Sequence, residues 1–569
     1  MRAKLKEIIE RAVGSEAGFD IMVSDHVEQG HYSTNLAMRH AKLIHQNPLD
    51  IANDFAERIK SSAPADFFEK VEVAPPGFIN FWLTPSAWHG SLDDILGQGN
   101  KYGVWNIGQN KTVIVEHSSL NIAKPIHVGH LRNAFTGDSL ANIYQATGYK
   151  VVRWNYLGDW GTQFGKLIVA YRKWGDEAAV EKDPIPTLTA LYIRFHDEAK
   201  NNESLEDEAR AEFRKLEQGD KENRKLWGWF KKESMREFNR VYKTLGIDFD
   251  IDIGENFFEK ELERVISELT EKGLTKESEG GLIIPLDKFN LPVALVRKSD
   301  GGSLYLTRDL ANLEYRLKEY KPAKILYVVG NEQSLHLSQV FAVFDLLGLG
   351  QGVELLHVKY GMVLGESGKK LSTREGNVVS GEEVLQKALG LARGIVQDKN
   401  PGLSRQEKED VAQAVAIGAL KYTNLKENRN SDIIFDWQKM LDFSGDSGPY
   451  LQYTYARLQS IKRKARRVDY YWPRRQLHLL KDEKELALIR AIAEYPYALL
   501  AALENTAPNL LCSYLYGLAN TTNSFYEACP VMKEEDSNLR VARLKLIDAT
   551  AQTLKSGLRI LGIKAPERI

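Results

Sequence analysis

The fold is decided by TVIVE (112–116), SSLNIAKPIHVGHLRNAF (118–135) and YKVVRW (149–154). The first stretch is a β-branched run, the residues from 129 to 146 have the apolar spacing of a helix, and the third has strand character again. A strand, a loop, a helix and a strand in this order predict one unit of a parallel, doubly wound sheet. At such a junction the helix N-terminus offers free N–H groups and a positive dipole end, which suits a polyphosphate.

A second unit of this kind follows further along the chain. It consists of KILYVVG (324–330), a helical pattern over 334–348 and ELLHVKYGMVL (354–364). The segment between the units, about 170–290, is rich in charged amphipathic helix and ends in a hairpin-like stretch. Two half-sheets separated by an insertion are typical of a nucleotide-binding domain with a connecting module.

The predicted fold is multidomain. Residues 1–105 predict an N-terminal α+β domain, in which GFINFWL (77–83) is a strand. Residues 106–410 predict a Rossmann-like α/β domain with a doubly wound parallel sheet and the insertion. Residues 411–569 have helical periodicity almost throughout and predict an all-α bundle.

Composition excludes several classes of protein. The 569 residues are 43% hydrophobic, and no run of about eighteen apolar residues predicts a membrane span. Cys512 and Cys529 are too few for a disulfide framework or a four-cysteine zinc site, so we expect buried thiols in a reducing cytoplasm. The net charge of −1 does not indicate a nucleic-acid partner. The basic and aromatic run at 461–475 fits either such a partner or a solvated helix face.

His127 and His130 are the first catalytic candidates. They lie three residues apart around Gly129, at the predicted start of the helix, where two imidazoles can donate hydrogen bonds to phosphate oxygens. A satisfied surface pair or part of a metal site is the alternative. No third ligand of the usual kind lies nearby in the sequence, so we predict no metal site in the protein itself.

HVGH (127–130) resembles the HIGH signature of class I aminoacyl-tRNA synthetases, and GKKLSTREGN (368–377) resembles their KMSKS signature. The flanking sequence is similar to arginyl-tRNA synthetases over essentially the whole chain. The strings that carry this resemblance are NIAKPIHVGHLR (121–132), NYLGDWGTQFG (155–165), SLYLTRDLANL (303–313), LKENRNSDIIFDW (425–437), GPYLQYTYARLQS (448–460) and LGIKAPERI (561–569).

The resemblance implies that ATP, accompanied by Mg²⁺, activates L-arginine for transfer to tRNA(Arg). Where KMSKS has its second lysine this chain has Thr373, and in the family a lysine just before HIGH, here Lys124, often accompanies that loss. The catalytic residues would be Lys124, His127, His130 and Lys370. The ATP-binding residues would be these four together with Gly129, Leu371 and Ser372.

A guanidinium pocket needs carboxylates and a flat aromatic face. Glu116 ends the first predicted strand, and Tyr305 and Asp309 are four residues apart, on one face if that segment is helical. The resemblance implies that Glu116 and Asp309 pair with the substrate guanidinium. The full set that it implies for arginine is Glu116, Ser119, Asn121, His130, Tyr305, Asp309 and Gln333.

For tRNA, the resemblance implies that the N-terminal domain contacts the D-loop through Asn80 and that the helical domain reads the anticodon. The anticodon candidates are Gly445, Tyr450, Tyr453 and Arg457. The last three also follow helical spacing, so part of that stripe could be core. The family often ends in methionine near the anticodon, whereas this chain ends in Ile569. Transfer to the 2′-hydroxyl and a first step that needs bound tRNA are further implications.

Two other functions remain open at this point. A cysteinyl or glutamyl synthetase would want zinc-binding cysteines, or arginines where Glu116 and Asp309 stand. A non-catalytic tRNA-binding paralogue would have lost the histidines or the pocket carboxylates, which this chain retains. We therefore expect a cytoplasmic arginyl-tRNA synthetase that acts as a monomer without a membrane partner.

Overall fold

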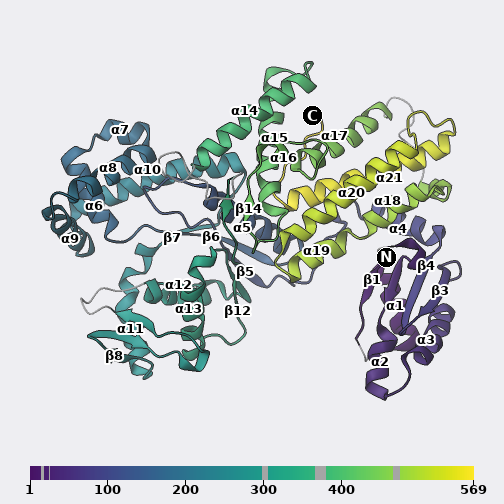
Figure 1. Cartoon of the computed structure of the whole chain (residues 1–569), viewed down its shortest axis with the longest axis horizontal. Helices are drawn as coiled ribbons and strands as arrows, with labels where there is room; N and C mark the ends of the chain where they lie inside the picture. Colours follow the sequence, from purple (N-terminus) through teal and green to yellow (C-terminus); the bar gives the residue numbers. More distant parts are fainter. Residues whose placement is uncertain (15–17, 25, 298–304, 366–379, 466–473) are drawn as a thin grey trace.

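A five-stranded parallel sheet forms the centre of the computed structural model, which describes residues 1–14, 18–24, 26–297, 305–365, 380–465 and 474–569 (Figure 1). The strand order is β12-β11-β5-β6-β7. The strands are β5 (Thr112–Glu116), β6 (Lys150–Leu157), β7 (Ile251–Gly254), β11 (Lys324–Tyr327) and β12 (Glu354–His357). Because β6 and β11 flank β5, the chain reverses its winding there, and sheets of this kind bind ligands at the carboxyl ends of the strands next to such a point.

The strands form because their apolar residues can be buried on both faces. The interior of β5, Val113–Val115, is fully buried, as a strand covered by helices on both sides requires. Helix α5 (Val128–Ala146) connects β5 to β6, and α13 (Ser334–Leu346) connects β11 to β12. The predicted parallel, doubly wound sheet is confirmed.

The boundary predicted for the insertion is wrong at one point. β7 lies inside the range of about 170–290 and pairs in parallel with β6 from Trp154 to Leu157. The helices α6 (Gln163–Trp174) to α10 (Lys221–Leu245) therefore form one excursion from the sheet. A second excursion holds α11 (Leu262–Glu271) and an antiparallel sheet of β8 (Lys276–Ser278), β9 (Gly281–Ile284) and β10 (Ala294–Arg297). The predicted hairpin is β8–β9.

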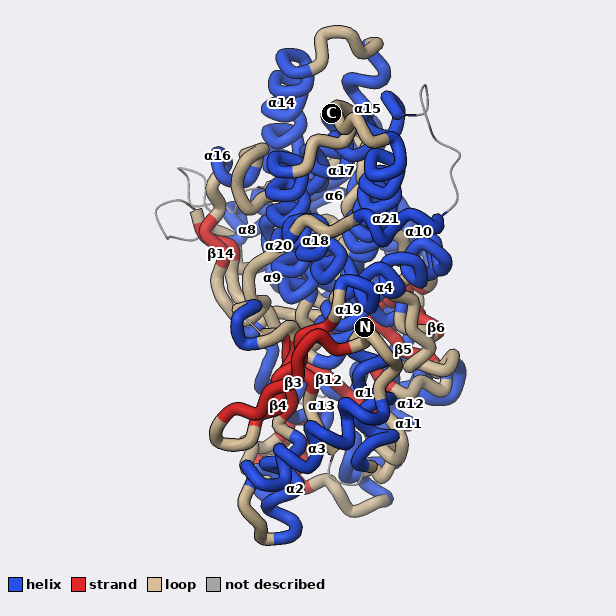
Figure 2. Tube along the Cα trace, turned by 90° about the vertical axis from the view of Figure 1, so that its right-hand side faces the viewer, coloured by secondary structure: helices blue, strands red, loops and turns tan. Residues whose placement is uncertain are grey.

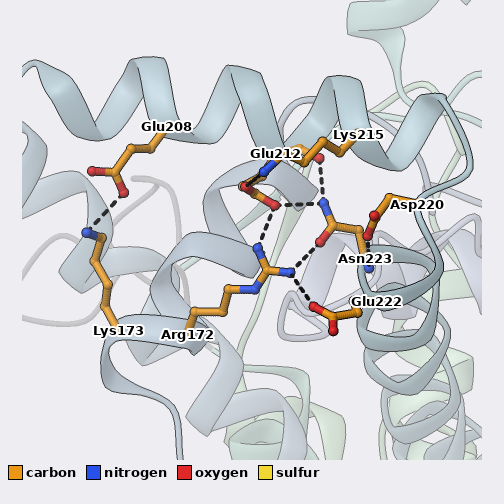
Figure 3. A network of polar contacts seen from close by, with 8 residues as sticks. All are labelled: Arg172, Lys173, Glu208, Glu212, Lys215, Asp220, Glu222 and Asn223. Atoms are coloured by element: carbon orange, nitrogen blue, oxygen red, sulfur yellow. Dashed lines mark hydrogen bonds and ion pairs between the residues drawn. The ribbon is translucent and has the colours of Figure 1, made fainter.

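A polar network ties the helices of the first excursion together (Figure 3). Arg172 of α6 pairs with Glu212 of α9 (Ser204–Glu217) at 2.6 Å and donates to Asn223 of α10 at 2.7 Å. The Asn223 side chain is fully buried and in turn donates to the Glu212 carboxylate at 2.8 Å. Because the guanidinium, the carboxylate and the amide all bond to one another, they fix the relative positions of α6, α9 and α10. This network braces α6, which begins inside the string NYLGDWGTQFG (155–165).

The N-terminal domain is a four-stranded antiparallel sheet of order β1-β2-β4-β3. Its strands are β1 (Ile21–Val23), β2 (Tyr32–Thr34), β3 (Phe68–Ala74) and β4 (Phe78–Leu83), with helices α1 (Arg2–Val13), α2 (Leu36–Ile44) and α3 (Pro48–Ser62). Ile79, Phe81 and Leu83 of β4 point into the core, and Asn80 lies on the opposite face. The domain contacts the helical domain where the Tyr32 hydroxyl donates to Glu494 at 2.6 Å.

The C-terminal part is the predicted helical bundle, most of whose helices lie in the upper half of Figure 2. Its helices are α14 (Gly381–Lys399), α15 (Arg405–Leu425), α16 (Trp437–Met440), α17 (Gly448–Ala465), α18 (Glu483–Ala493), α19 (Tyr495–Glu504), α20 (Pro508–Ala528) and α21 (Ser537–Ile560). Glu483–Glu504 is long and apolar enough to cross a membrane by composition, but it forms α18 and α19 and packs within the bundle. Cys512 and Cys529 are both free and buried.

Candidate active site

The histidine pair forms the N-terminal cap of α5. His127 is the N-cap residue, and its Nδ1 accepts from the Gly129 N–H at 3.1 Å. The Nδ1 of His130 accepts from the His127 N–H at 3.2 Å, which completes a reciprocal capping box. The two rings stack with centroids 3.5 Å apart and planes 25° apart. The sequence forms this cap because the loop before it is extended at His127, where a helix can begin.

This geometry fixes the protonation of both rings. Because each Nδ1 accepts from a backbone N–H, the proton of a neutral ring must be on Nε2. Burial lowers the pKa of His127, and burial together with the charges of His127 and Lys124 lowers the pKa of His130 to about 3. Both imidazoles are therefore neutral near pH 7, and each presents one Nε2–H donor suited to a phosphate oxygen.

Two further elements lie close to this pair. Lys124 is exposed, and its charge reaches His130. The Gly381 N–H at the start of α14 donates to the Ile126 carbonyl at 2.8 Å, and Ser380 forms a β-bridge with His127. Lys370, Leu371 and Ser372 of the KMSKS-like string, and Thr373, lie outside the described residues.

The carboxylate that ends β5 already has a guanidinium partner. Glu116 is buried and forms an ion pair with Arg316 of α12 (Tyr305–Tyr320), whose side chain is also fully buried. The Arg316 guanidinium lies 4.4 Å from the ring centroid of Trp154 and 5.4 Å from that of Tyr327. Burial raises the pKa of Glu116, with Arg316 acting against it and the charge of Asp309 adding to it. Asp309 therefore lies close enough to Glu116 for its charge to act on that carboxyl group.

Asp309 lies on the first turns of α12 and remains accessible. Its side chain is 23% exposed and contacts Nε2 of His336, on α13, at 2.5 Å. Burial lowers the pKa of His336, but the hydrogen bond and charge of Asp309 outweigh it, so that the pKa is raised overall. The segment 305–309 is helical, as the spacing of Tyr305 and Asp309 required, and the Tyr305 side chain lies outside the described part.

Glu255 is a functional candidate that the sequence reasoning missed. It follows β7 directly, at the start of a 3-10 helix (Glu255–Glu261), so it lies at the same edge of the sheet as Glu116. Burial raises its pKa to about 8, with Arg308 acting against the rise and Asp309 and Asp159 reinforcing it. A half-buried carboxyl whose pKa is raised in part by neighbouring carboxylates is typical of a functional site. The signal in the sequence is its position directly after the apolar-charged alternation of β7, which the prediction places inside the insertion and not in the sheet.

The loop that follows β5 carries two more predicted residues. The buried Oγ of Ser119 has no hydrogen-bond partner among the described residues, and its backbone N–H donates to Asn155 at 3.3 Å. Asn121 forms a β-bridge with Gly158, where an added Cβ would lie 2.2 Å from the Asn121 Oδ1. Any larger residue at Gly158, the first glycine of GDWGTQFG (158–165), would displace the Asn121 side chain from this position. Gln333 is exposed and ends the short 3-10 helix (Asn331–Gln333) before α13.

The structure separates the anticodon candidates. Tyr450 is 7% exposed, and its hydroxyl bonds to Asn520 and Asn523 of α20, both at 2.7 Å, so it belongs to the core side of α17. Tyr453 is 37% exposed. The Arg457 guanidinium stacks 3.9 Å from the ring centroid of Tyr526. Gly445 lies in the turn before α17, and Asn80 is distant in sequence, on the N-terminal sheet.

Among the described residues, no three His, Cys, Asp or Glu side chains are grouped so that they could hold a metal ion. The site thus consists of two neutral imidazole donors, an exposed lysine and a cluster of carboxylates along one sheet edge. Such an arrangement can stabilise developing charge on a polyphosphate beside a cationic ligand.

Comparison with known proteins gives the class first. Residues 91–437 match the family model described as tRNA synthetases class I (R), catalytic domain. Residues 1–83 match the Arginyl tRNA synthetase N terminal domain, and residues 451–569 match the DALR anticodon binding domain.

Full-length relatives give the family. The chain is 42% identical to the arginine–tRNA ligase of Clostridioides difficile, over 99% of this chain and 98% of that protein, and 40% identical to that of Halothermothrix orenii, over 100% and 99%. Its fold superposes on the arginyl-tRNA synthetase of Thermus thermophilus with a TM-score of 0.83 at 27% identity, covering 100% of both chains. The chain belongs to the arginyl-tRNA synthetase family.

Proposed function

We propose that the chain is an arginine–tRNA ligase, which joins L-arginine to the 3′-terminal adenosine of tRNA(Arg) and converts ATP to AMP and pyrophosphate. The observation that carries this proposal is that the capped histidine pair at the start of α5 and the carboxyl groups of Glu116 and Glu255, at the ends of β5 and β7, belong to the same edge of the parallel sheet. The first group suits a triphosphate and the second suits a guanidinium.

In the first step, a carboxylate oxygen of arginine attacks the α-phosphorus of ATP, the bond from that phosphorus to the bridging oxygen breaks, and pyrophosphate leaves with its Mg²⁺. His127 and His130 donate their Nε2 protons in hydrogen bonds to phosphate oxygens, and Lys124 and Lys370 supply positive charge. No general base is needed, because the attacking carboxylate is already ionised. Positioning of the two substrates therefore provides most of the rate.

The guanidinium pocket is assigned to Asp309 and Glu255. Asp309 is accessible, and Glu255 lies within range of its charge. Glu116 is paired with Arg316, so its proposed role is to position α12 against β5 and to set the field around the substrate. Tyr305, Asn121, Gln333 and Ser119 are proposed to line the same pocket. A neutral analogue such as citrulline offers no cation to Asp309 and cannot favour the ionised form of Glu255, so it forgoes the charge-assisted contacts that arginine makes and is rejected.

In the second step, a hydroxyl oxygen of the terminal ribose attacks the arginyl carbonyl carbon, the bond to the adenylate phosphate oxygen breaks, and AMP leaves. We propose the 2′-hydroxyl as the acceptor and a first step that requires bound tRNA. Tyr453 and Arg457 are the proposed anticodon contacts, because an exposed aromatic ring and a stacked guanidinium can bind unstacked bases. Asn80 is the proposed D-loop contact.

The test is aminoacylation of total tRNA with each labelled amino acid in turn. We expect charging with arginine alone, and charging with any other amino acid would overturn the substrate assignment. Pyrophosphate exchange is then measured with and without tRNA, and strong exchange without tRNA would contradict the proposed dependence. Sedimentation of the purified chain tests the further proposal that it acts as a monomer, and cell fractionation tests the proposed cytoplasmic location.

A further inference from the structure

Arg132, in the helix that follows the histidine pair, is buried and donates to four backbone carbonyls. Its Nη1 donates to Gly361 at 2.8 Å and to Met362 at 3.0 Å. Its Nη2 donates to Arg429 at 3.1 Å and to Ser431 at 2.8 Å. Arg132 is 1% exposed, so its guanidinium satisfies acceptors that are shielded from water.

The four carbonyls lie next to a pair of short parallel strands from distant parts of the chain. These are β13 (Val363–Leu364) and β14 (Ile433–Ile434). The Met362 N–H also donates to the Asp432 carboxylate at 2.7 Å, which fixes the register of the pair. Arg132 therefore joins α5 to both strands at once.

Arg429 extends these contacts into the helical domain. Its Nη1 donates to the Lys359 carbonyl at 3.1 Å. Its Nε donates to the Thr506 carbonyl at 3.1 Å, and its Nη2 lies 3.3 Å from the Thr506 hydroxyl. Thr506 forms the turn between α19 and α20 and has a φ of 46°, a conformation that needs support from its surroundings.

We propose that Arg132 and Arg429 are positioning residues, which hold the histidine pair of α5 in a fixed relation to β13–β14 and to the α19–α20 turn of the helical domain. The inference rests on the proposed function, since it assigns the histidine pair to ATP. A guanidinium is suited to this task because its five N–H donors lie in one rigid plane. A lysine ammonium offers only three donors from a point charge and cannot reach four carbonyls in this arrangement.

The experiment compares Arg132→Lys and Arg429→Lys with a matched control. The control is Arg543→Lys, which alters another buried arginine, paired with Glu485 at 2.7 Å and Glu534 at 2.7 Å in the helical domain. All three variants keep the charge and lose hydrogen bonds, so all three should melt at a lower temperature. The measurements, made well below the melting temperatures, are kcat and KM for ATP in aminoacylation, the Kd for arginine and the Kd for tRNA.

For Arg132→Lys we expect kcat to fall by about tenfold to a hundredfold and KM for ATP to rise, since a shift of about 1 Å can cost that much. For Arg429→Lys we expect a smaller fall in kcat. The Kd values for arginine and tRNA should stay within about twofold in both, because neither residue is placed at those ligands. In the Arg543→Lys control, kcat and KM should stay near those of the unaltered chain.

Two results would overturn the inference. One is that Arg132→Lys lowers the melting temperature as the control does but leaves kcat and KM for ATP unchanged. The other is that the Kd for arginine weakens by the same factor as kcat, which indicates general damage to the sheet edge. The unaltered chain tests the proposed function separately: if it charges arginine while Arg132→Lys behaves as the control, the function stands and the positioning role fails.

Discussion

Arginine binding should release a proton from Glu255, and Glu255→Gln should abolish this release. Burial raises the pKa of this carboxyl to about 8, and the charges of Asp309 and Asp159 reinforce the shift. A guanidinium placed between Glu255 and Asp309 favours the ionised carboxylate and lowers the pKa of Glu255 in the complex. The proton therefore leaves as arginine binds, and affinity must increase as the pH rises toward that pKa.

The magnitude follows from the pKa of about 8 in the free protein. At about pH 6.5 only about 3% of Glu255 is ionised, so the Kd for arginine should be roughly 30-fold weaker than its high-pH limit. At about pH 8.5 the Kd should be only about 1.3-fold weaker than that limit. Between these two values the Kd should tighten by roughly 25-fold, or about 1.9 kcal/mol, if the pKa of Glu255 in the complex lies below about 5.5.

Titration calorimetry in buffers of different ionisation enthalpy measures both the Kd and the number of protons released. Near pH 7 the unaltered chain should release close to one proton per arginine bound. Glu255→Gln should release almost none, and its Kd for arginine should not decrease as the pH rises. Glu261→Gln is the matched control, because Glu261 lies on the same 3-10 helix and pairs with Arg264 at 2.8 Å. If the Kd of the unaltered chain is flat from pH 6.5 to 8.5, the assignment of Glu255 to the guanidinium is refuted.

Three other predictions concern single side chains. Asp309→Asn should lower kcat/KM for arginine by about 100-fold or more, because a substrate cation loses its charged partner, and a loss below about fivefold in steady-state charging would argue against that contact. Lys124→Ala should severely depress pyrophosphate exchange, and near-normal exchange would remove Lys124 from the site. Tyr453→Ala should weaken tRNA binding by about 1–3 kcal/mol in filter-binding assays. Tyr450→Phe should instead lower the free energy of unfolding by about 1 kcal/mol and leave tRNA binding unchanged. If Tyr450→Phe weakened tRNA binding and Tyr453→Ala did not, the two roles would have to be exchanged.

The central fold could be predicted because its signals are local. The run from Thr112 to Glu116 is apolar enough to be buried on both faces, and the helix of the next segment has its cap at His127. Strand, cap and helix are all encoded within a few residues of where they form. The histidine pair could therefore be placed at the sheet edge from the sequence, and the structure places it there.

The pocket could not be completed in the same way, because its partners come from distant segments. β7 is short, and its residues alternate between charged and apolar, so it reads as an exposed strand and not as part of a parallel sheet. Without β7, nothing places Glu255 beside Asp309. The partner of Glu116 is Arg316, two hundred positions further along the chain. Helical spacing likewise identifies the stripe of Tyr450 and Tyr453 but not which of them faces the bundle core.

The Glu116–Arg316 pair gives the pocket a charge balance that favours one substrate. Because Arg316 neutralises Glu116, the empty pocket holds Asp309 beside the raised-pKa His336, and Glu255 as a neutral acid. An incoming guanidinium can pair with both Asp309 and the newly ionised Glu255, since its planar fork reaches two carboxylates at once. A lysine ammonium is a compact, strongly hydrated charge that does not extend to both carboxylates at once. Glu255 must then either stay protonated or become an ionised carboxylate that is buried without a partner. Discrimination against lysine therefore arises from the cost of ionising Glu255 when no guanidinium pairs with it. The difference in affinity between arginine and lysine should be smaller in Glu255→Gln.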